Sequence, residues 1–220
     1  MVGAGFPVVA TTSSGVAASL GFADRQGTPA DEMFDAVRRI ASAVPVPVTA
    51  DVEGGYRLGP ETLAGRLLGT GAVGLNLEDS DHDHPGTLLD PAAQAERIAG
   101  VKRAAREAGT DVVLNARVDV FLRPGSLDEQ VAETLRRAQT YLDAGADCVF
   151  PILAADESVI ARLVGEIAGP VNIMFTAGTP QPGRLAELGV VRVSLGGGLR
   201  RLAMSAANAA LDRLRSGSAP

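Results

Sequence analysis

Short apolar stretches recur along the chain, separated by longer stretches in which apolar and polar residues follow a helical period. Each short stretch is rich in β-branched residues and apolar at almost every position, which predicts strands buried on both faces. Such strands are typical of a parallel sheet covered by helices on both sides. We predict strands over residues 8–12, 46–52, 73–77, 112–116, 148–151, 171–175 and 191–195.

The stretches between these strands carry helix signals at their starts. Asp90 is a capping residue, and the Pro91 that follows it fits the first helical position. Ser126 is followed by Asp128 and Glu129, whose charges suit the positive end of a helix dipole. We predict helices over residues 30–43, 60–70, 91–108, 126–144, 156–168, 181–188 and 198–215.

Seven strands, each followed by a helix, indicate either a closed barrel or an open doubly wound sheet. A TIM-type (β/α)8 barrel has eight strands and runs to about 250 residues, whereas this chain has 220. Residues 3–7 resemble the end of a helix that leads into the first predicted strand. We therefore expect residues 1–220 to form a single α/β domain, a TIM-type (β/α)8 barrel that lacks the first β/α unit at its N-terminus. An open seven-stranded sheet is the alternative.

Composition and charge narrow the class of protein. Hydrophobic residues make up 46% of the chain, which suffices for a large core and excludes a disordered chain. The net charge of −6 argues against a nucleic-acid-binding protein, which needs a basic face. The sequence has neither an apolar run long enough to span a membrane nor a secretory signal at its N-terminus. With one cysteine, Cys148, we expect a cytoplasmic protein, and we expect that thiol to be buried rather than nucleophilic.

Acidic residues gather at the ends of two neighbouring predicted strands. Asp51 and Glu53 are spaced i, i+2, so they point the same way from an extended strand, and Glu78 ends the next strand. Functional groups of a parallel barrel collect at this edge. Three converging carboxylates repel one another unless a divalent cation lies between them, and Mg²⁺ prefers such oxygen ligands. These residues therefore predict a metal site, with solvated loop acids as the alternative.

Other candidate residues follow the strands at the same edge. Arg117 ends an apolar strand and could clamp a carboxylate or phosphate with two hydrogen bonds, or instead pair with Asp119. Ser13, Ser14 and Gly15 read as a turn whose hydroxyls and N–H groups could cradle an anionic oxygen. Asn172, in the strand at 171–175, is a further candidate for substrate binding.

The two histidines, His82 and His84, lie together in a polar loop that follows Glu78. One of them could supply a proton or a further metal ligand in a loop over the barrel mouth. The alternative is a solvated polar loop without a role in chemistry. Lys102, the only lysine, lies within a predicted helix, where a Schiff-base role is not expected.

In combination, these residues resemble the motifs of the isocitrate lyase/phosphoenolpyruvate mutase superfamily. The resemblance covers almost the whole chain, and the family's first strand, with its Asn-x-x-Asp segment, has no counterpart in this sequence. The stretches that carry the resemblance are TTSSG at 11–15, LGFAD at 20–24, TADVEGGY at 49–56, GLNLED at 74–79 and NARVD at 115–119.

The resemblance implies a (β/α)8 barrel whose last helix, here 199–216, is often exchanged between subunits of a homodimer or homotetramer. It also implies Mg²⁺ or Mn²⁺ and a small 2-oxo acid or its enolate as substrate. The residues that match the family's metal shell are Asp51, Glu53 and Glu78, with Asp24 approaching the metal from the loop after the Ser-Gly turn. Those that match its substrate contacts are Ser14, Gly15 and Arg117.

The loop after Glu78 departs from both well-known branches of this superfamily. Isocitrate and methylisocitrate lyases carry a Lys-Lys/Arg-Cys-Gly-His segment there and phosphonomutases carry a Lys and an Asn, whereas residues 80–86 of this chain are SDHDHPG. We expect an Mg²⁺-dependent lyase or decarboxylase that cleaves a C–C bond of a small di- or tricarboxylic acid through a pyruvate-type enolate. The alternatives are a P–C bond mutase or hydrolase and a catalytically impaired metal-binding member.

A further alternative is a phosphate-binding barrel, which the glycines at 196–198 before a helix would permit. That alternative leaves the cluster of Asp51, Glu53 and Glu78 without a role. We expect a small carboxylate as the binding partner, and neither nucleic acid nor a membrane.

Overall fold

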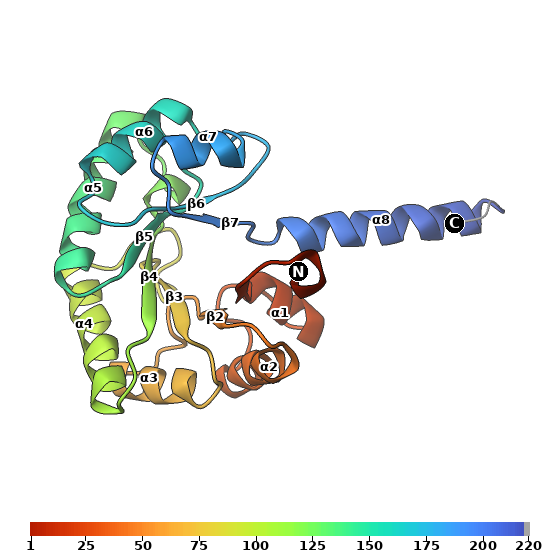
Figure 1. The fold of residues 1–220 in the computed structure, drawn as a ribbon, viewed down its shortest axis with the longest axis horizontal. Coiled ribbons are helices and arrows are strands. Elements are labelled where there is room, and N and C mark those ends of the chain that lie inside the picture. The colour runs from red at the N-terminus through yellow and green to blue at the C-terminus, as the bar shows by residue number, and fades with distance from the viewer. Residues whose placement is uncertain (218–220) are drawn as a thin grey trace.

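The structure is a computed structural model and describes residues 1–217, so the last three residues of the predicted 1–220 domain lie outside the described part. Strands and helices alternate along the described chain, and the helices lie around the outside of the strands (Figure 1). The strands are β1 (Val9–Ala10), β2 (Val48–Asp51), β3 (Gly74–Glu78), β4 (Val113–Val118), β5 (Cys148–Pro151), β6 (Asn172–Met174) and β7 (Arg192–Ser194). Each lies within or beside a stretch that the apolar pattern predicts.

The helices match the predicted positions with one addition. The helix that opens at Ser126 has a complete capping box, in which Ser126 and Glu129 bond each other's backbone N–H groups. Asp90 caps its helix through the N–H groups of Ala92 and Ala93. The helices are α1 (Ser13–Leu20), α2 (Ala30–Ala43), α3 (Pro60–Leu68), α4 (Pro91–Glu107), α5 (Leu127–Asp143), α6 (Glu157–Glu166), α7 (Pro182–Glu187) and α8 (Gly198–Arg215).

The added helix, α1, corrects the prediction that Ser13, Ser14 and Gly15 form a turn. These three residues are the first turn of the helix, which begins after Thr12. Serine and glycine are weak helix formers in a helix interior. In the first turn the backbone N–H groups have no partner within the helix, so little is lost by placing such residues there.

All the strands are parallel. Five of them form a sheet in chain order from β1 to β5, and β6 pairs with β7. A single bridge between Val149 and Val171 joins the two groups. Within the described residues no strand pairing joins β7 to β1, so the ring of strands is open there. Parallel strands bring all their carboxyl ends to one edge, which is where the candidate residues lie.

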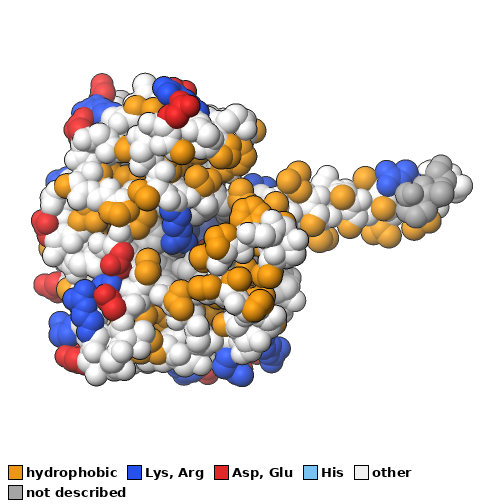
Figure 2. Space-filling model, viewed as in Figure 1, with side chains coloured by type: hydrophobic (Ala, Val, Ile, Leu, Met, Phe, Trp, Pro, Cys, Tyr) orange, Lys and Arg blue, Asp and Glu red, His pale blue; other side chains and the backbone are white. Residues whose placement is uncertain are grey.

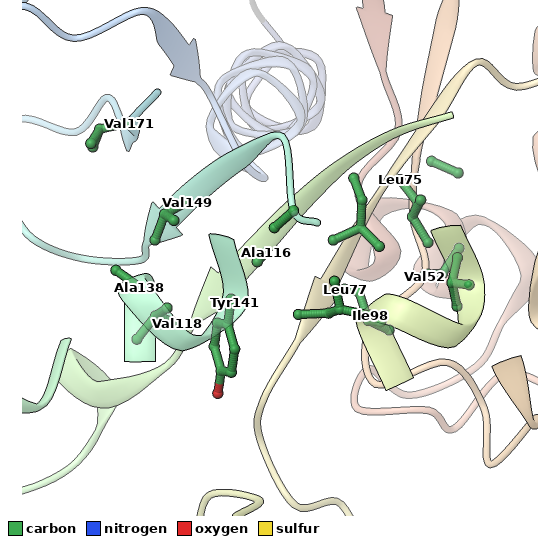
Figure 3. Close-up of a cluster of buried hydrophobic side chains, with 14 of the residues drawn as sticks. Val52, Leu75, Leu77, Ile98, Ala116, Val118, Ala138, Tyr141, Val149 and Val171 are labelled. Atoms are coloured by element: carbon green, nitrogen blue, oxygen red, sulfur yellow. The ribbon is translucent and has the colours of Figure 1, made fainter. Parts of the chain in front are cut away.

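The core lies between the strands and the surrounding helices. Side chains alternate along each strand, and the outward set, such as Leu75, Leu77 and Ala116, packs against α4 and α5 (Figure 3). The inward set includes polar residues: Asn76 and Asn115 are level with each other in the strand register and share a hydrogen bond of 2.8 Å. Because the outward side chains anchor the strands, the register of the inward polar groups is fixed as well.

Helix α8 differs from the others because it leaves the body of the molecule (Figure 1). None of its residues is buried, and it carries several exposed large apolar side chains, visible along it in Figure 2. Among the described residues, no helix combines the length and apolar character needed to cross a membrane.

Candidate active site

Three potential metal-ligating groups meet at the carboxyl ends of the strands. One ligand atom each from Glu53, Glu78 and His82 lies within 4.8 Å of the others. Glu53 follows β2, Glu78 ends β3, and His82 lies in the loop after β3. Glu53 and Glu78 are two of the three acids that the sequence predicts as metal ligands. The third member of this group is His82, and Asp51 is not part of it.

Glu53 is held in place by a strained turn. Its backbone has a φ of 50°, which is unusual for a residue with a side chain. Its carboxylate accepts hydrogen bonds from the Gln26 N–H at 2.6 Å and from the Tyr56 hydroxyl at 2.8 Å. Burial raises the pKa of Glu53, and Asp24 is close enough to raise it further. Such strain persists where the surroundings fix the backbone, as they do at active sites.

Glu78 is nearly buried and is bonded through both carboxylate oxygens. Oε1 lies 2.7 Å from Nε2 of His82, and Oε2 lies 2.6 Å from a guanidinium nitrogen of Arg117. The backbone carbonyl of Glu78 accepts a bond from the Gln94 amide at 3.1 Å. Burial raises the pKa of Glu78 to about 7, although His82 and Arg117 act to lower it.

Arg117 lies level with Glu78 in the strand register, which places the two side chains next to each other. Its Nε and NH2 atoms also donate to the two oxygens of Asp119 at 2.6 and 3.0 Å. The structure thus contains the ion pair with Asp119 that the sequence offered as the alternative. The same guanidinium also pairs with Glu78 of the cluster, and its role as a clamp for a substrate anion stays a prediction.

The loop after β3 turns one histidine inward and the other outward. The His82 side chain is 13% exposed, whereas that of His84 is 76% exposed and pairs with Asp81. The hydrogen bond to the Glu78 carboxylate raises the pKa of His82 above its ordinary value. Arg57, in the strained turn after β2, forms an ion pair with Asp83 of this loop. Of the two predicted histidines, only His82 therefore lies in the cluster, and His84 lies outside it.

Asp51 lies beside the cluster but is engaged elsewhere. One carboxylate oxygen accepts bonds from the Ser13 N–H and the Ser13 hydroxyl, both at 3.0 Å. The other accepts from the Glu53 N–H at 3.4 Å. Asp51 thus joins the start of α1 to the turn that carries Glu53. Its role as a metal ligand stays a prediction.

The remaining predicted residues occupy different positions. Asn172 is fully buried, and its amide nitrogen and oxygen bond Ser194 Oγ at 2.8 and 3.1 Å. Each side chain thus supplies the other's partner, as buried polar groups require, and the contact of Asn172 with substrate stays a prediction. Ser14 and Gly15 lie at the start of α1, and Asp24 is exposed near Glu53. Their proposed contacts stay predictions.

The cluster suits a hard divalent cation. Carboxylate and imidazole donors from three chain segments converge within reach of one ion. Each carboxylate oxygen can accept more than one bond, so the contacts of Glu53 and Glu78 described above leave capacity for a cation. The residues present therefore fit Mg²⁺ or Mn²⁺.

Sequence reasoning missed the groups that hold these residues in place. Tyr56 stands in the quoted motif but received no role, and Gln26 and Gln94 gave no signal at all. One signal was available in the composition: the chain has two tyrosines, and both donate to buried carboxylates. A rare hydroxyl that is buried in the core usually has a specific partner.

Comparison with known proteins then settles the family. A family model described as phosphoenolpyruvate phosphomutase matches residues 1–215. The chain belongs to the isocitrate lyase/phosphoenolpyruvate mutase superfamily. Members of this superfamily are enzymes, lyases and mutases, and they typically depend on divalent metal ions.

Individual relatives agree with this membership. A Mycobacterium tuberculosis protein described as uncharacterized is 35% identical over 87% of this chain and 70% of its own length. The 2-methylisocitrate lyase of Salmonella typhimurium is 30% identical over 80% of this chain and 62% of the lyase.

Solved structures agree on the fold. A Burkholderia cenocepacia protein provisionally described as a phosphonomutase has a TM-score of 0.90 and 38% identity, covering 96% of this chain and 87% of that one. A 2,3-dimethylmalate lyase has a TM-score of 0.85 and 25% identity, covering 98% and 77%. The predicted TIM-barrel type of fold is thereby confirmed.

Proposed function

We propose that this protein is an Mg²⁺-dependent lyase or decarboxylase that cleaves a C–C bond of a small 2-oxo or 2-hydroxy di- or tricarboxylic acid. The observation that carries the proposal is the juxtaposition of Glu53, Glu78 and His82 with the guanidinium of Arg117. Cleavage next to a carbonyl leaves negative charge on an enolate oxygen, and a site of this kind supplies positive charge where that oxygen develops.

Glu53 and Glu78 would hold the cation, which when bound supplies Lewis-acid stabilisation of the enolate oxygen. Arg117 would bind the substrate carboxylate through the N–H donors that face the cluster, because a guanidinium is always charged and carries several donors. Asp119 holds two nitrogens of that guanidinium, which orients the remaining one toward the cluster. Ser14 and Gly15, at the start of α1, are the further substrate contacts in this proposal.

We assign proton transfer to Nε2 of His82. Imidazole is a poorer ligand than carboxylate or water for Mg²⁺, so His82 is better suited to hold and deliver a proton. Its hydrogen bond with Glu78 raises its pKa, which favours the protonated imidazole. For a 2-oxo acid that loses CO₂, the electron pair of the broken C–C bond forms the enolate, and the proton would go to the enolate carbon to give the released 2-oxo acid. For a 2-hydroxy acid, the neutral imidazole would first take the hydroxyl proton as the C–C bond breaks and the alcohol carbon becomes a carbonyl, and would then deliver that proton to the enolate carbon.

A P–C bond mutase is the second candidate. It is favoured by the phosphoenolpyruvate phosphomutase description of the matching family and by the likeness to the Burkholderia protein. Both reactions require a cation, a carboxylate clamp and an enolate, so the cluster alone supports either. The loop at 80–86 matches neither branch of the superfamily. We place C–C cleavage first because it needs only the cation, the carboxylate clamp and a source of a proton.

A substrate panel with Mg²⁺ tests the proposal. The panel contains oxaloacetate, malate and alkylmalates, citrate-type acids and phosphonopyruvate, with released pyruvate or 2-oxo acid measured by a coupled dehydrogenase and P–C products by ³¹P NMR. We expect metal-dependent 2-oxo acid release from at least one C–C substrate, lost in Arg117→Met. Turnover of phosphonopyruvate alone would favour the mutase. Mn²⁺ binding without any turnover would favour a catalytically impaired member.

We also propose that the protein assembles as a homodimer or homotetramer in which α8 packs on a neighbouring subunit. The support is the helix itself, which extends from the body of the molecule and buries none of its residues (Figure 1). Helices in water are stabilised mainly by packing an apolar face, and within residues 1–217 α8 buries no such face.

A further inference from the structure

A buried polar group lies behind the site and has no part in the chemistry described so far. Asp79 and Tyr141 are 0% exposed and Arg137 is 6% exposed. Tyr141 donates from its hydroxyl to Asp79 Oδ2 at 2.8 Å, and Arg137 donates to the same oxygen at 3.0 Å. In Figure 3 the Tyr141 ring lies among the apolar core side chains. Burying charges is costly unless every partner is supplied.

The second oxygen of Asp79 connects this group to the active site. Asp79 Oδ1 accepts the backbone N–H of Asp119 at 2.8 Å. Asp119 is 0% exposed, and both of its carboxylate oxygens accept hydrogen bonds from Arg117. The Ser80 hydroxyl also donates to Asp119 Oδ2, at 2.5 Å. The chain of contacts therefore runs from α5 through the end of β3 to the guanidinium at the end of β4.

The contacts on Asp79 Oδ2 would be enough to hold α5 against the sheet. The hydrogen bond that Oδ1 accepts from the Asp119 N–H has another effect, because it fixes the backbone of the residue whose carboxylate orients Arg117. A clamp loses much of its effect when misplaced by about 1 Å. A buried, fully bonded support is a means of preventing that displacement.

We propose that Asp79, Arg137 and Tyr141 are positioning residues that set the direction of the Arg117 guanidinium through Asp119. This inference rests on the proposed role of Arg117 as the carboxylate clamp. It assigns to α5 a part in anion recognition, although among the described residues no hydrogen bond or ion pair joins α5 to the cluster. The three residues act as one unit, so removing any one of them loosens the same guanidinium.

The chain offers a matched control at the other end of the same strands. Lys102 is also buried, and its ammonium donates to Val112 O at 2.7 Å and Asp147 Oδ2 at 2.8 Å, beside the starts of β4 and β5. Lys102→Met thus removes a buried ammonium, together with its ion pairs to Asp147 and Asp111, from the opposite end of the strands. Asp147→Asn is a gentler variant of that control.

The test uses oxalate, a mimic of the pyruvate enolate, as the probe in the presence of Mg²⁺. Calorimetry measures the dissociation constants of oxalate and of Mg²⁺ alone for the wild type, Tyr141→Phe, Asp79→Asn, Arg117→Met and the Lys102 and Asp147 controls. We expect Tyr141→Phe and Asp79→Asn to weaken oxalate binding by roughly five- to thirty-fold. Their affinity for Mg²⁺ should stay within about twofold of the wild type, and the controls should leave both constants unchanged.

A spectroscopic readout separates positioning from general loosening. Arginine-selective ¹H–¹⁵N NMR reports the Nε–H of Arg117, identified by its absence in Arg117→Met. We expect this signal to shift and exchange faster in Tyr141→Phe but not in Asp147→Asn. The double variant Tyr141→Phe/Asp119→Asn should weaken oxalate binding no more than Asp119→Asn alone, because both act on one path.

The experiment distinguishes failure of the Arg117 clamp from failure of the positioning role of Asp79, Arg137 and Tyr141. Two results would overturn the clamp and with it the proposed function. One is an Arg117→Met variant that binds oxalate as tightly as the wild type, and the other is a wild-type protein that does not bind oxalate. Loss of binding in Arg117→Met together with unchanged binding and an unchanged Nε–H signal in Tyr141→Phe would leave the clamp standing and overturn the positioning role. Equal losses in the Lys102 or Asp147 controls would also overturn it, since any buried break would then suffice.

Discussion

At the scale of single residues, the two buried glutamates decide whether the cluster binds a cation. Glu53 and Glu78 supply the carboxylates of the cluster, so Glu78→Gln removes a negative charge while keeping the shape of the side chain. We expect the affinity for Mn²⁺ to fall at least about tenfold in Glu78→Gln and in Glu53→Gln. Titration of Mn²⁺ followed by electron paramagnetic resonance measures the free ion directly.

Glu61→Gln is the control for this experiment. Glu61 lies at the start of α3, and its side chain is 68% exposed beside Arg103. The same loss of charge there should leave Mn²⁺ binding unchanged. If Glu61→Gln weakened binding as much as Glu78→Gln, the effect would come from the net charge of the protein, and the cluster would not be the site.

Cys148 is 5% exposed, which confirms the expectation that it is buried. Its reactivity is a second prediction at this scale. Burial raises the pKa of its thiol from 9.0 to about 11. At about pH 8 this lowers the reactive thiolate fraction on the order of a hundredfold relative to the unfolded chain. We expect slow reaction with a thiol reagent in the native state and fast reaction in urea.

The sign of the pH effect on stability follows from the same thiol. Below pH 9 the thiol is protonated in both states, and between pH 9 and about 11 only the unfolded chain loses the proton. The free energy of unfolding should therefore decrease across that window. Rapid native-state labelling at about pH 8 would contradict the burial and reopen a nucleophilic role for Cys148.

From the sequence, the site could be predicted only for residues of suitable chemical type that lie at the ends of predicted strands. Glu53, Glu78 and Arg117 follow or end apolar strands, and parallel strands bring such residues together at one edge. The choice between His82 and His84 depends on the path of one loop, which no spacing rule fixes. Asp79 and Tyr141 are 62 residues apart in the chain, so their contact needs the folded packing.

At the scale of elements, the glycines of α3 and α4 show how closely the outer helices pack. A Cβ added at Gly100 of α4 would lie 2.6 Å from Cβ of Pro60, which begins α3. A Cβ added at Gly65 of α3 would meet nothing within 4 Å. The same substitution should therefore have opposite effects at the two positions.

We expect Gly100→Ala to lower the free energy of unfolding by about 1–3 kcal/mol, because the backbones must separate. We expect Gly65→Ala to raise it by about 0.5–1 kcal/mol, because alanine favours the helix and fits the space. Urea denaturation of the two variants measures both changes. A stabilised Gly100→Ala would show that α3 and α4 are not in close contact at this point.

Helix positions were more predictable than strand lengths. Helices over 30–43 and 198–215 coincide with α2 and α8, because amphipathic patterns with clear end signals run for several turns. The predicted strand at 8–12 is reduced to the two residues of β1. Its length depends on pairing with β2 and not on its own sequence, since β1 pairs on one side only in the described sheet. Helix α1 was missed because its first turn is Ser-Ser-Gly.

At the scale of the whole molecule, α8 predicts an assembly. Leu202, Leu211 and Leu214 are 69%, 62% and 54% exposed, which is unusual for large apolar residues on one helix. Within the described residues α8 has no buried side chain. We expect the wild-type protein to be a dimer or larger, and Leu202→Glu/Leu211→Glu to be smaller, because charges on this helix are costly to bury in an interface.

Size-exclusion chromatography with light scattering measures the mass, and circular dichroism checks that the barrel remains folded. Leu127→Glu is the matched control, since Leu127 is also an exposed leucine, 58% exposed, at the first position of α5 and not on α8. It should leave the mass unchanged. A monomeric wild type would refute the assembly, and an unchanged mass in Leu202→Glu/Leu211→Glu would place the interface elsewhere, leaving the exposed leucines of α8 without a partner among copies of this chain.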